Sequence, residues 1–259
     1  RQFGSGLTGT KYTSPELLSG TWVQAAVGTD HICVRSSSGT ISCAGRNQRG
    51  QLGQGTTTNL TAFTQVGSAN TWTSVVAGGA ITCGRQTNAV WCWGSNEFGS
   101  MGLGVADVRL SPTALTGTTA MVSVGGNRVC LLATTGSLSC AGGNGYGALR
   151  RGTTTAELAS TARAVTPVLD WTLLAPGKRF TCGISAGALH CWGSNTSGQL
   201  GQGDAVTQSF PTQVGTATDW ASVTVGGLHA CGIRGTALYC WGENGDGQLG
   251  DGGTTDRYA

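Results

Sequence analysis

Charged residues and proline are scarce in this chain. Only 10% of its 259 residues are Asp, Glu, Lys or Arg, and 5 are Pro. The 15 basic and 12 acidic residues give a formal net charge of +3 and form no block of one sign, so the basic stripe of a nucleic-acid-binding protein is missing. Long apolar runs are also missing, which argues against membrane insertion. The chain begins at Arg1 with no signal-peptide pattern, and we expect a processed product or a fragment.

Glycine is abundant where these other residues are rare. The chain contains 45 Gly, with no Gly-X-Y period that would indicate collagen, and it is 39% hydrophobic with 8 Trp. That apolar content is too high for a disordered protein. Glycine costs about 1 kcal/mol per helical position relative to alanine. The composition therefore predicts a folded, all-β protein of strands and tight turns.

The ten cysteines form five pairs with nearly constant spacing. Members of a pair lie 9 or 10 residues apart, and the first members are separated by 47 to 52 residues, which is the periodicity of a repeat protein. The pairs are Cys33 and Cys43, Cys83 and Cys92, Cys130 and Cys140, Cys182 and Cys191, and Cys231 and Cys240. A glycine precedes each first cysteine by five residues, at Gly28, Gly78, Gly125, Gly177 and Gly226.

Turn chemistry places the two cysteines of each pair opposite each other in a β-hairpin. Where the spacing is 10, the centre is a three-residue loop with glycine third, at Gly39 and Gly136, as a left-handed third residue requires. Where the spacing is 9, the two-residue centres 87–88, 186–187 and 235–236 contain Asn or Gly, which can supply a positive φ. Opposed residues in a hairpin are close enough for a disulfide. We therefore predict one disulfide in each repeat.

Zinc is the alternative explanation for ten cysteines. Zinc sites use close ligand spacings such as C-x2-C, with a nearby His in many cases, and neither pattern occurs here as a unit. Five disulfides indicate an oxidising compartment. We therefore expect an extracellular or cell-surface protein.

The repeats resemble the regulator-of-chromosome-condensation (RCC1) repeat, a unit of about 50 residues that forms β-propeller blades. The last copy, GGLHACGIRGTALYCWGENGDGQLG, carries the motif most fully. Ala44 and Ala141 replace the second-strand Trp in copies one and three, and Arg150 replaces a loop Gly in copy three. The cysteine pairs depart from the intracellular members, so the chain resembles a disulfide-rich, secreted branch of the family.

The resemblance implies a single propeller-type domain over residues 1–259, with small antiparallel sheets as blades. We place repeat cores at about 22–70, 72–118, 119–169, 171–219 and 220–259, with residues 1–21 completing a blade. The segment at 1–18 resembles the loop after a hairpin, so six such loops accompany five hairpins. We expect either part of a six- or seven-bladed ring or a chain whose ends pair with another copy.

Two further sets of repeated residues have expected structural roles. The strands before the hairpins begin with a tryptophan that we expect to pack between blades: Trp22, Trp72, Trp171 and Trp220, with Thr119 in the third copy. An asparagine stands four residues after each second cysteine, at Asn47, Asn96, Asn144, Asn195 and Asn244. We expect these asparagines to cap turns through side-chain to backbone hydrogen bonds.

Motifs that could indicate catalysis have structural explanations. The G-x-S-x-G match at 183–187 lies in a hairpin, whereas a nucleophile elbow needs a strand, a turn and a helix. The G-x-G-x-x-G match at 4–9 is not followed by a helix. His31 and His229 share a repeat position in non-adjacent copies, His190 stands apart, and the acidic residues are scattered. We therefore expect no enzyme activity, no metal and no cofactor.

The remaining expectations concern modification and partners. Asn59 and Asn195 are possible N-glycosylation sites, and Asn59 is the better acceptor because Asn195 belongs to the tight loop. We favour a non-enzymatic extracellular scaffold or interaction module, either alone or as a subunit of a larger fibre or polymer. The alternatives are a secreted propeller that binds a protein, as an enzyme inhibitor, or a glycan. Guanine-nucleotide exchange on a small GTPase is implied by the intracellular family, and the disulfides argue against it.

Overall fold

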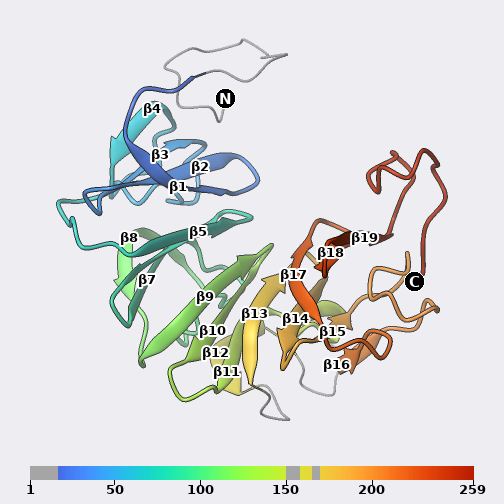
Figure 1. Cartoon of the computed structure of the whole chain (residues 1–259). Coiled ribbons are helices and arrows are strands. Elements are labelled where there is room, and N and C mark those ends of the chain that lie inside the picture. The colour runs from blue at the N-terminus through green and yellow to red at the C-terminus, as the bar shows by residue number, and fades with distance from the viewer. Residues whose placement is uncertain (1–16, 150–157, 165–169) are drawn as a thin grey trace.

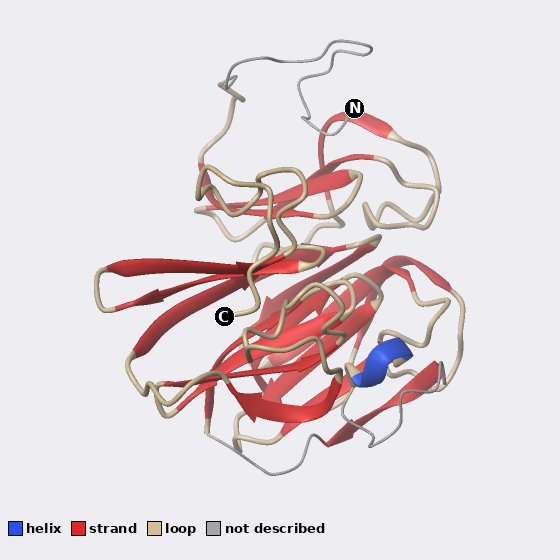
Figure 2. Cartoon of the chain, turned by 90° about the vertical axis from the view of Figure 1, so that its right-hand side faces the viewer, coloured by secondary structure: helices blue, strands red, loops and turns tan. Residues whose placement is uncertain are grey.

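The computed structural model of the chain is an all-β protein. It describes residues 17–149, 158–164 and 170–259. Apart from strands it contains one short 3-10 helix, η1 (Gly145–Gly147), within the described residues (Figure 2). No helix in the described ranges has the length and apolar character needed to cross a membrane.

The strands form five antiparallel sheets that follow one another along the chain. The first holds β1 (Trp22–Val27), β2 (His31–Ser36), β3 (Ile41–Gly45) and β4 (Leu60–Gln65). The second holds β5 (Ser74–Gly78), β6 (Ile81–Gln86), β7 (Ala89–Ser95) and β8 (Val108–Ala114). The third holds β9 (Thr119–Gly125), β10 (Arg128–Ala133), β11 (Leu138–Gly143) and β12 (Leu158–Ala164). The fourth holds β13 (Trp171–Pro176), β14 (Phe180–Ser185), β15 (Ala188–Gly193) and β16 (Gln208–Gln213), and the fifth β17 (Trp220–Val225), β18 (His229–Arg234) and β19 (Ala237–Gly242).

The sheets are arranged as blades around an arc that is open between the first and the fifth (Figure 1). The first strand of each sheet contacts the first strand of the next, so β1, β5, β9, β13 and β17 line the inside of the arc. The propeller architecture predicted from the repeats is confirmed. Residues 1–16, most of the segment expected to complete a blade, lie outside the described residues.

The five disulfides join directly opposed residues of the second and third strands, as predicted. Cys33 faces Cys43 in the β2–β3 ladder, and the other four pairs have the same register. The Cα atoms of each pair lie 4.1 to 4.2 Å apart. No cysteine of the described sheets remains free.

The hairpin turns follow the predicted loop lengths, with one correction. Gly39 and Gly136 take φ values of 79° and 82° at the third position of their loops. In the β6–β7 turn the positive φ belongs to Thr87, at 52°, and not to Asn88. The error arose because a two-residue turn can carry its left-handed residue first, and Thr87 is placed there although β-branched residues disfavour that conformation.

The repeated asparagines hold the loops after the hairpins, as predicted. In each repeat the asparagine Oδ1 accepts a hydrogen bond from the backbone N–H five residues later, at Leu52, Met101, Leu149, Leu200 and Leu249. Asn47 also donates from Nδ2 to the carbonyl of Thr56 at 2.8 Å. Each side chain thereby holds the first turn of the loop that follows its hairpin.

The core consists of four clusters, each shared by two adjacent blades. In the first, Ile41 of β3 packs with Trp72 and Val75 of the next blade. Leu138 packs with Trp171 and Leu174 in the same way, and Trp220 packs against the cluster of the fourth and fifth blades. The expected packing between blades is therefore confirmed for Trp72, Trp171 and Trp220, whereas Trp22 contacts Phe63 of its own blade. A blade therefore buries its apolar face only against its neighbour, as in other repeat proteins.

Candidate functional site

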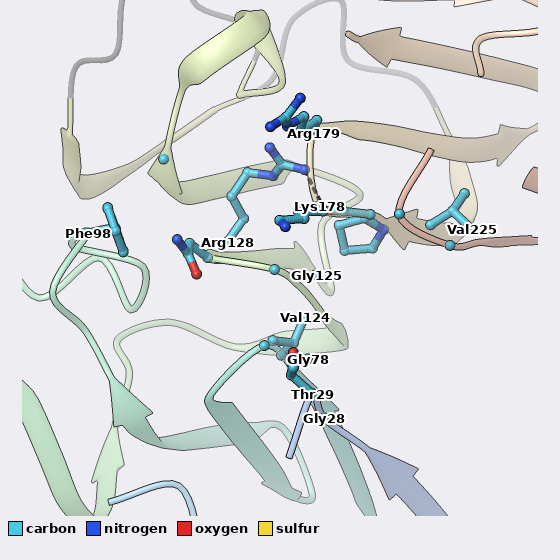
Figure 3. A pocket seen from close by; sticks show the side chains of 18 of the residues that line it. Gly28, Thr29, Gly78, Phe98, Val124, Gly125, Arg128, Lys178, Arg179 and Val225 are labelled. Atoms are coloured by element: carbon cyan, nitrogen blue, oxygen red, sulfur yellow. Dashed lines mark hydrogen bonds between the residues drawn. The ribbon is translucent and has the colours of Figure 1, made fainter. Parts of the chain in front are cut away.

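The turns between the first and second strands of all five blades meet at one end of the central channel. They surround a cavity of about 740 Å³, which we call the channel-mouth pocket (Figure 3). Glycines supply much of its wall, among them Gly28, Gly78, Gly125, Gly177 and Gly226. The regular glycine five residues before each first cysteine therefore marks this pocket.

Glycine is needed at the channel mouth because neighbouring blades approach there backbone to backbone. The N–H of Thr29 in the first blade donates to the carbonyl of Gly79 in the second at 2.9 Å. A Cβ added to Gly125 would lie 1.8 Å from the carbonyl oxygen of Pro176 in the next blade, and one added to Gly78 would lie 2.6 Å from that of Val124. These contacts set the spacing of the blades around the pocket.

Gly125→Ala is expected to destabilise the protein by about 1–3 kcal/mol or more, because the added methyl overlaps backbone that cannot rotate away. The measurement is urea unfolding followed by tryptophan fluorescence. Gly143→Ala is the matched control, since Gly143 lines the same pocket and an added Cβ would meet no atom within 4 Å. Equal midpoints for the two variants would show that the blades do not rely on this close approach.

The position two residues before each first cysteine contacts the next blade in the first four blades. It is occupied by His31, Ile81, Arg128, Phe180 and His229. The Nε2 of buried His31 lies 2.8 Å from Oγ1 of Thr82 in the second blade. The Nη2 of Arg128 donates to the carbonyls of Gly177 at 2.6 Å and Phe180 at 3.1 Å in the fourth blade.

Arg128 brings a buried positive charge to the pocket. Only 2% of the residue is exposed, and burial lowers the pKa of its guanidinium to about 10, so it stays protonated at neutral pH. Within the described part of the chain it forms no ion pair, and its Nε has no hydrogen-bond partner. The signal for Arg128 in the sequence is the alignment of the repeats, which places an arginine at a position otherwise held by apolar residues and histidines.

A second exposed surface lies at the open end of the arc, on the sheet β17–β19. On the sheet face turned toward the fourth blade, Tyr239 borders a hollow of about 530 Å³ whose lining includes Trp220 and Trp241. The opposite face points away from the fourth blade and exposes Ile233 and Leu238, which pair directly across β18 and β19. Apart from an isolated bridge between Gly242 and Arg257, β19 has β18 as its only strand neighbour among the described residues. We call the face that exposes Ile233 and Leu238 the end face.

The structure also places the motifs considered for catalysis. Residues 183–187 comprise the end of β14 and the turn before β15, and residues 4–9 lie outside the described ranges. His31 and His229 belong to different blades, and no three His, Cys, Asp or Glu side chains of the described residues group as metal ligands.

The two possible glycosylation sites differ in exposure. Asn59 is exposed, with Oδ1 accepting from the N–H of Asn47. Asn195 is buried, and its Nδ2 donates to the backbone carbonyl and the carboxylate of Asp204, both at 2.9 Å. A glycan on Asn195 would replace one of these two N–H donors and would need room beside a side chain that is fully buried, so glycosylation stays a prediction for Asn59.

Comparison with known proteins places these features in a family context. Residues 186–233 and 22–51 match two models of the regulator of chromosome condensation (RCC1) repeat. The chain is 30% identical over 199 residues to the ultraviolet-B receptor UVR8 of Arabidopsis thaliana, a match that covers 74% of this chain and 45% of the receptor.

Among solved structures, Prp20p of Saccharomyces cerevisiae superposes with a TM-score of 0.81 at 18% identity, over 92% of this chain and 62% of Prp20p. Human WBSCR16 superposes with a TM-score of 0.75 at 22% identity, over 85% of this chain and 59% of WBSCR16. Prp20p itself binds Gsp1p and histones. The chain spans less than half the length of UVR8 and less than two thirds of these two proteins.

Proposed function

Because this chain is built of RCC1 repeats folded as propeller blades, we propose that it is a non-catalytic protein-interaction module of an oxidising compartment, either outside the cell or on its surface. The five disulfides support the compartment, since such bonds persist where thiols are not kept reduced. The partner we propose is a second copy of this chain, bound at the end face.

The proposal that two copies associate at the end face rests on the exposure of Leu238. Its equivalents in the other four blades are Ile41, Val90, Leu138 and Leu189. Those four are 0–1% exposed because the following blade covers them, whereas Leu238 is 69% exposed. Ile233 is 42% exposed and its equivalent Ile184 in the fourth blade only 2%. The end face is thus one half of a blade-to-blade interface.

The first blade presents the other half of the same interface. The residues that cover Ile41, Val90, Leu138 and Leu189 from the following blade include Val75, Val122, Leu174 and Val223, all buried. Their equivalent in the first blade, Ala25, is exposed. The fifth blade of one copy can therefore pack on the first blade of another, a head-to-tail contact that repeats into rings or filaments.

Leu238→Asp is expected to abolish this association, because it places a charge where the contact must exclude water. In sedimentation velocity at protein concentrations up to about 100 µM, the unaltered chain is expected to form larger species that the variant lacks. Val206→Asp is the matched control, since Val206 is also exposed, at 58%, and lies outside the end face. An unaltered chain that stays monomeric throughout this range would refute the proposal.

Exposed aromatic residues favour a protein partner over a glycan. A glycan-binding propeller would need one exposed aromatic side chain per blade at a common position. Phe98 and Tyr146 share a repeat position in the second and third blades, where the other blades carry Arg49, Ser197 and Asp246. The pattern therefore does not continue around the arc.

A further inference from the structure

We propose that the channel-mouth pocket binds an acidic polypeptide segment, with clustered Asp or Glu carboxylates facing Arg128, Lys178 and Arg179. These three side chains lie next to one another along one side of the pocket (Figure 3). This site is separate from the end face, and it concerns a different partner from the second copy proposed above.

The charge of the pocket is positive and lacks an internal counter-charge. Its lining includes these three cations and no Asp or Glu. Lys178 and Arg179 are exposed and form no ion pair within the described part of the chain. The nearby carboxylate of Asp30 is already paired with Arg46 at 3.4 Å. A concave site lined by one sign of charge concentrates ligands of the opposite sign.

Arg128 adds to the positive potential of the pocket, although its side chain is buried in the lining. A buried charge without a counter-charge is costly, and among the described residues the guanidinium has only the carbonyls of Gly177 and Phe180 as acceptors. The same position holds Ile81 in the second blade and Phe180 in the fourth, so the blade contact does not itself require a cation. A ligand carboxylate in the pocket would compensate the charge. Lys178 and Arg179 would contact the ligand directly.

The rest of the lining fits a polypeptide better than a sulfated sugar. The wall between the glycine turns is apolar, with Val27, Val124 and Val225 from three blades. Tyr146 and Phe98 are exposed beside the pocket, and the Arg179 guanidinium lies 5.1 Å from the centre of the Tyr146 ring. Apolar and aromatic groups suit the apolar side chains between carboxylates, whereas a sulfated sugar has few apolar groups to contact these three valines.

The test is fluorescence anisotropy with a fluorescein-labelled peptide of six glutamates interrupted by one leucine. The unaltered chain is expected to bind this peptide, with an affinity that falls as salt is added. Lys178→Ala/Arg179→Ala is expected to weaken binding at least about tenfold through the loss of two charge-assisted contacts. Arg128→Phe, which copies the residue of the fourth blade, is expected to weaken it about threefold or more.

The control for charge is Arg49→Ala/Arg234→Ala, which removes two positive charges from surface ion pairs outside the pocket and is expected to leave binding within about twofold. Equal loss in this control and in Lys178→Ala/Arg179→Ala would overturn the proposal. Binding of a heparin oligosaccharide without binding of the peptide would overturn it in favour of a glycan. Leu238→Asp should retain peptide binding, so failure of this site and failure of self-association are distinguishable.

Discussion

Reduction of the five disulfides is expected to unfold this protein at 37 °C. Each bridge joins cysteines only 9 or 10 residues apart, and closing such a loop stabilises a fold by at most about 3 kcal/mol in the chain-entropy model. Five such contributions are comparable to the whole stability of a typical domain, about 5–15 kcal/mol. Thermal melting followed by circular dichroism, with and without reductant, measures the effect.

A single bridge gives a graded version of the same experiment. Cys83→Ala/Cys92→Ala removes one disulfide from the second blade and is expected to cost about 2–3 kcal/mol. Alkylation followed by mass measurement should count ten thiols in the fully reduced chain. A fully reduced chain that melts at the same temperature as the oxidised one would show that packing between blades is sufficient by itself.

Acidification is expected to destabilise the contact between the first two blades through His31. The hydroxyl of Thr82 donates to the carbonyl of Gln51, so it accepts from Nε2–H of His31 and leaves Nδ1 unprotonated and buried. Burial lowers the pKa of His31 from 6.5 to about 4, although Asp30 opposes the shift. The unfolded chain therefore binds more protons between these values, and stability falls as pH drops from about 6.5 to about 4.

The full loss is on the order of 3 kcal/mol, from about 1.4 kcal/mol per unit of pKa difference. Urea midpoints measured across this pH range provide the test. His31→Gln keeps an N–H donor toward Thr82 but does not titrate, so its stability should vary less with pH. Burial also lowers the pKa of His190, and that contribution is common to both proteins. Parallel curves for the two proteins would contradict the assignment to His31.

Because blades pack only against their neighbours, removal of one disulfide or protonation of His31 is expected to act first on the blade or blade contact that contains it. The four core clusters each join two neighbouring blades, so the protein behaves as a row of units stabilised by their neighbours. Among the described residues, an interior blade is supported on two sides, whereas the first and fifth are supported on one. Conditions that weaken one contact are therefore expected to release the end blades before the interior ones.

The sequence by itself determined the local structure of each blade, namely its hairpin, its disulfide and the asparagine hydrogen bond that follows. The signals were the spacing of the cysteines, the length of each hairpin loop and the repeated asparagines. Each of them depends on residues ten or fewer positions apart, so hairpin register and local hydrogen bonds are sufficient to predict the structure there. The structure bears out the disulfides and the asparagine bonds. The exception is the β6–β7 turn, where Thr87 takes the left-handed conformation, because two-residue turns of different types share similar sequences.

Only the tertiary structure decided what the blades do together. Arg128 and Lys178 are fifty positions apart in the sequence, and they meet because adjacent blades bring their glycine turns to one mouth. Leu238 has the same local sequence setting as buried Leu189, and it differs only because no described blade follows it. Exposure and convergence of this kind depend on contacts between distant segments, which repeat periodicity alone does not specify.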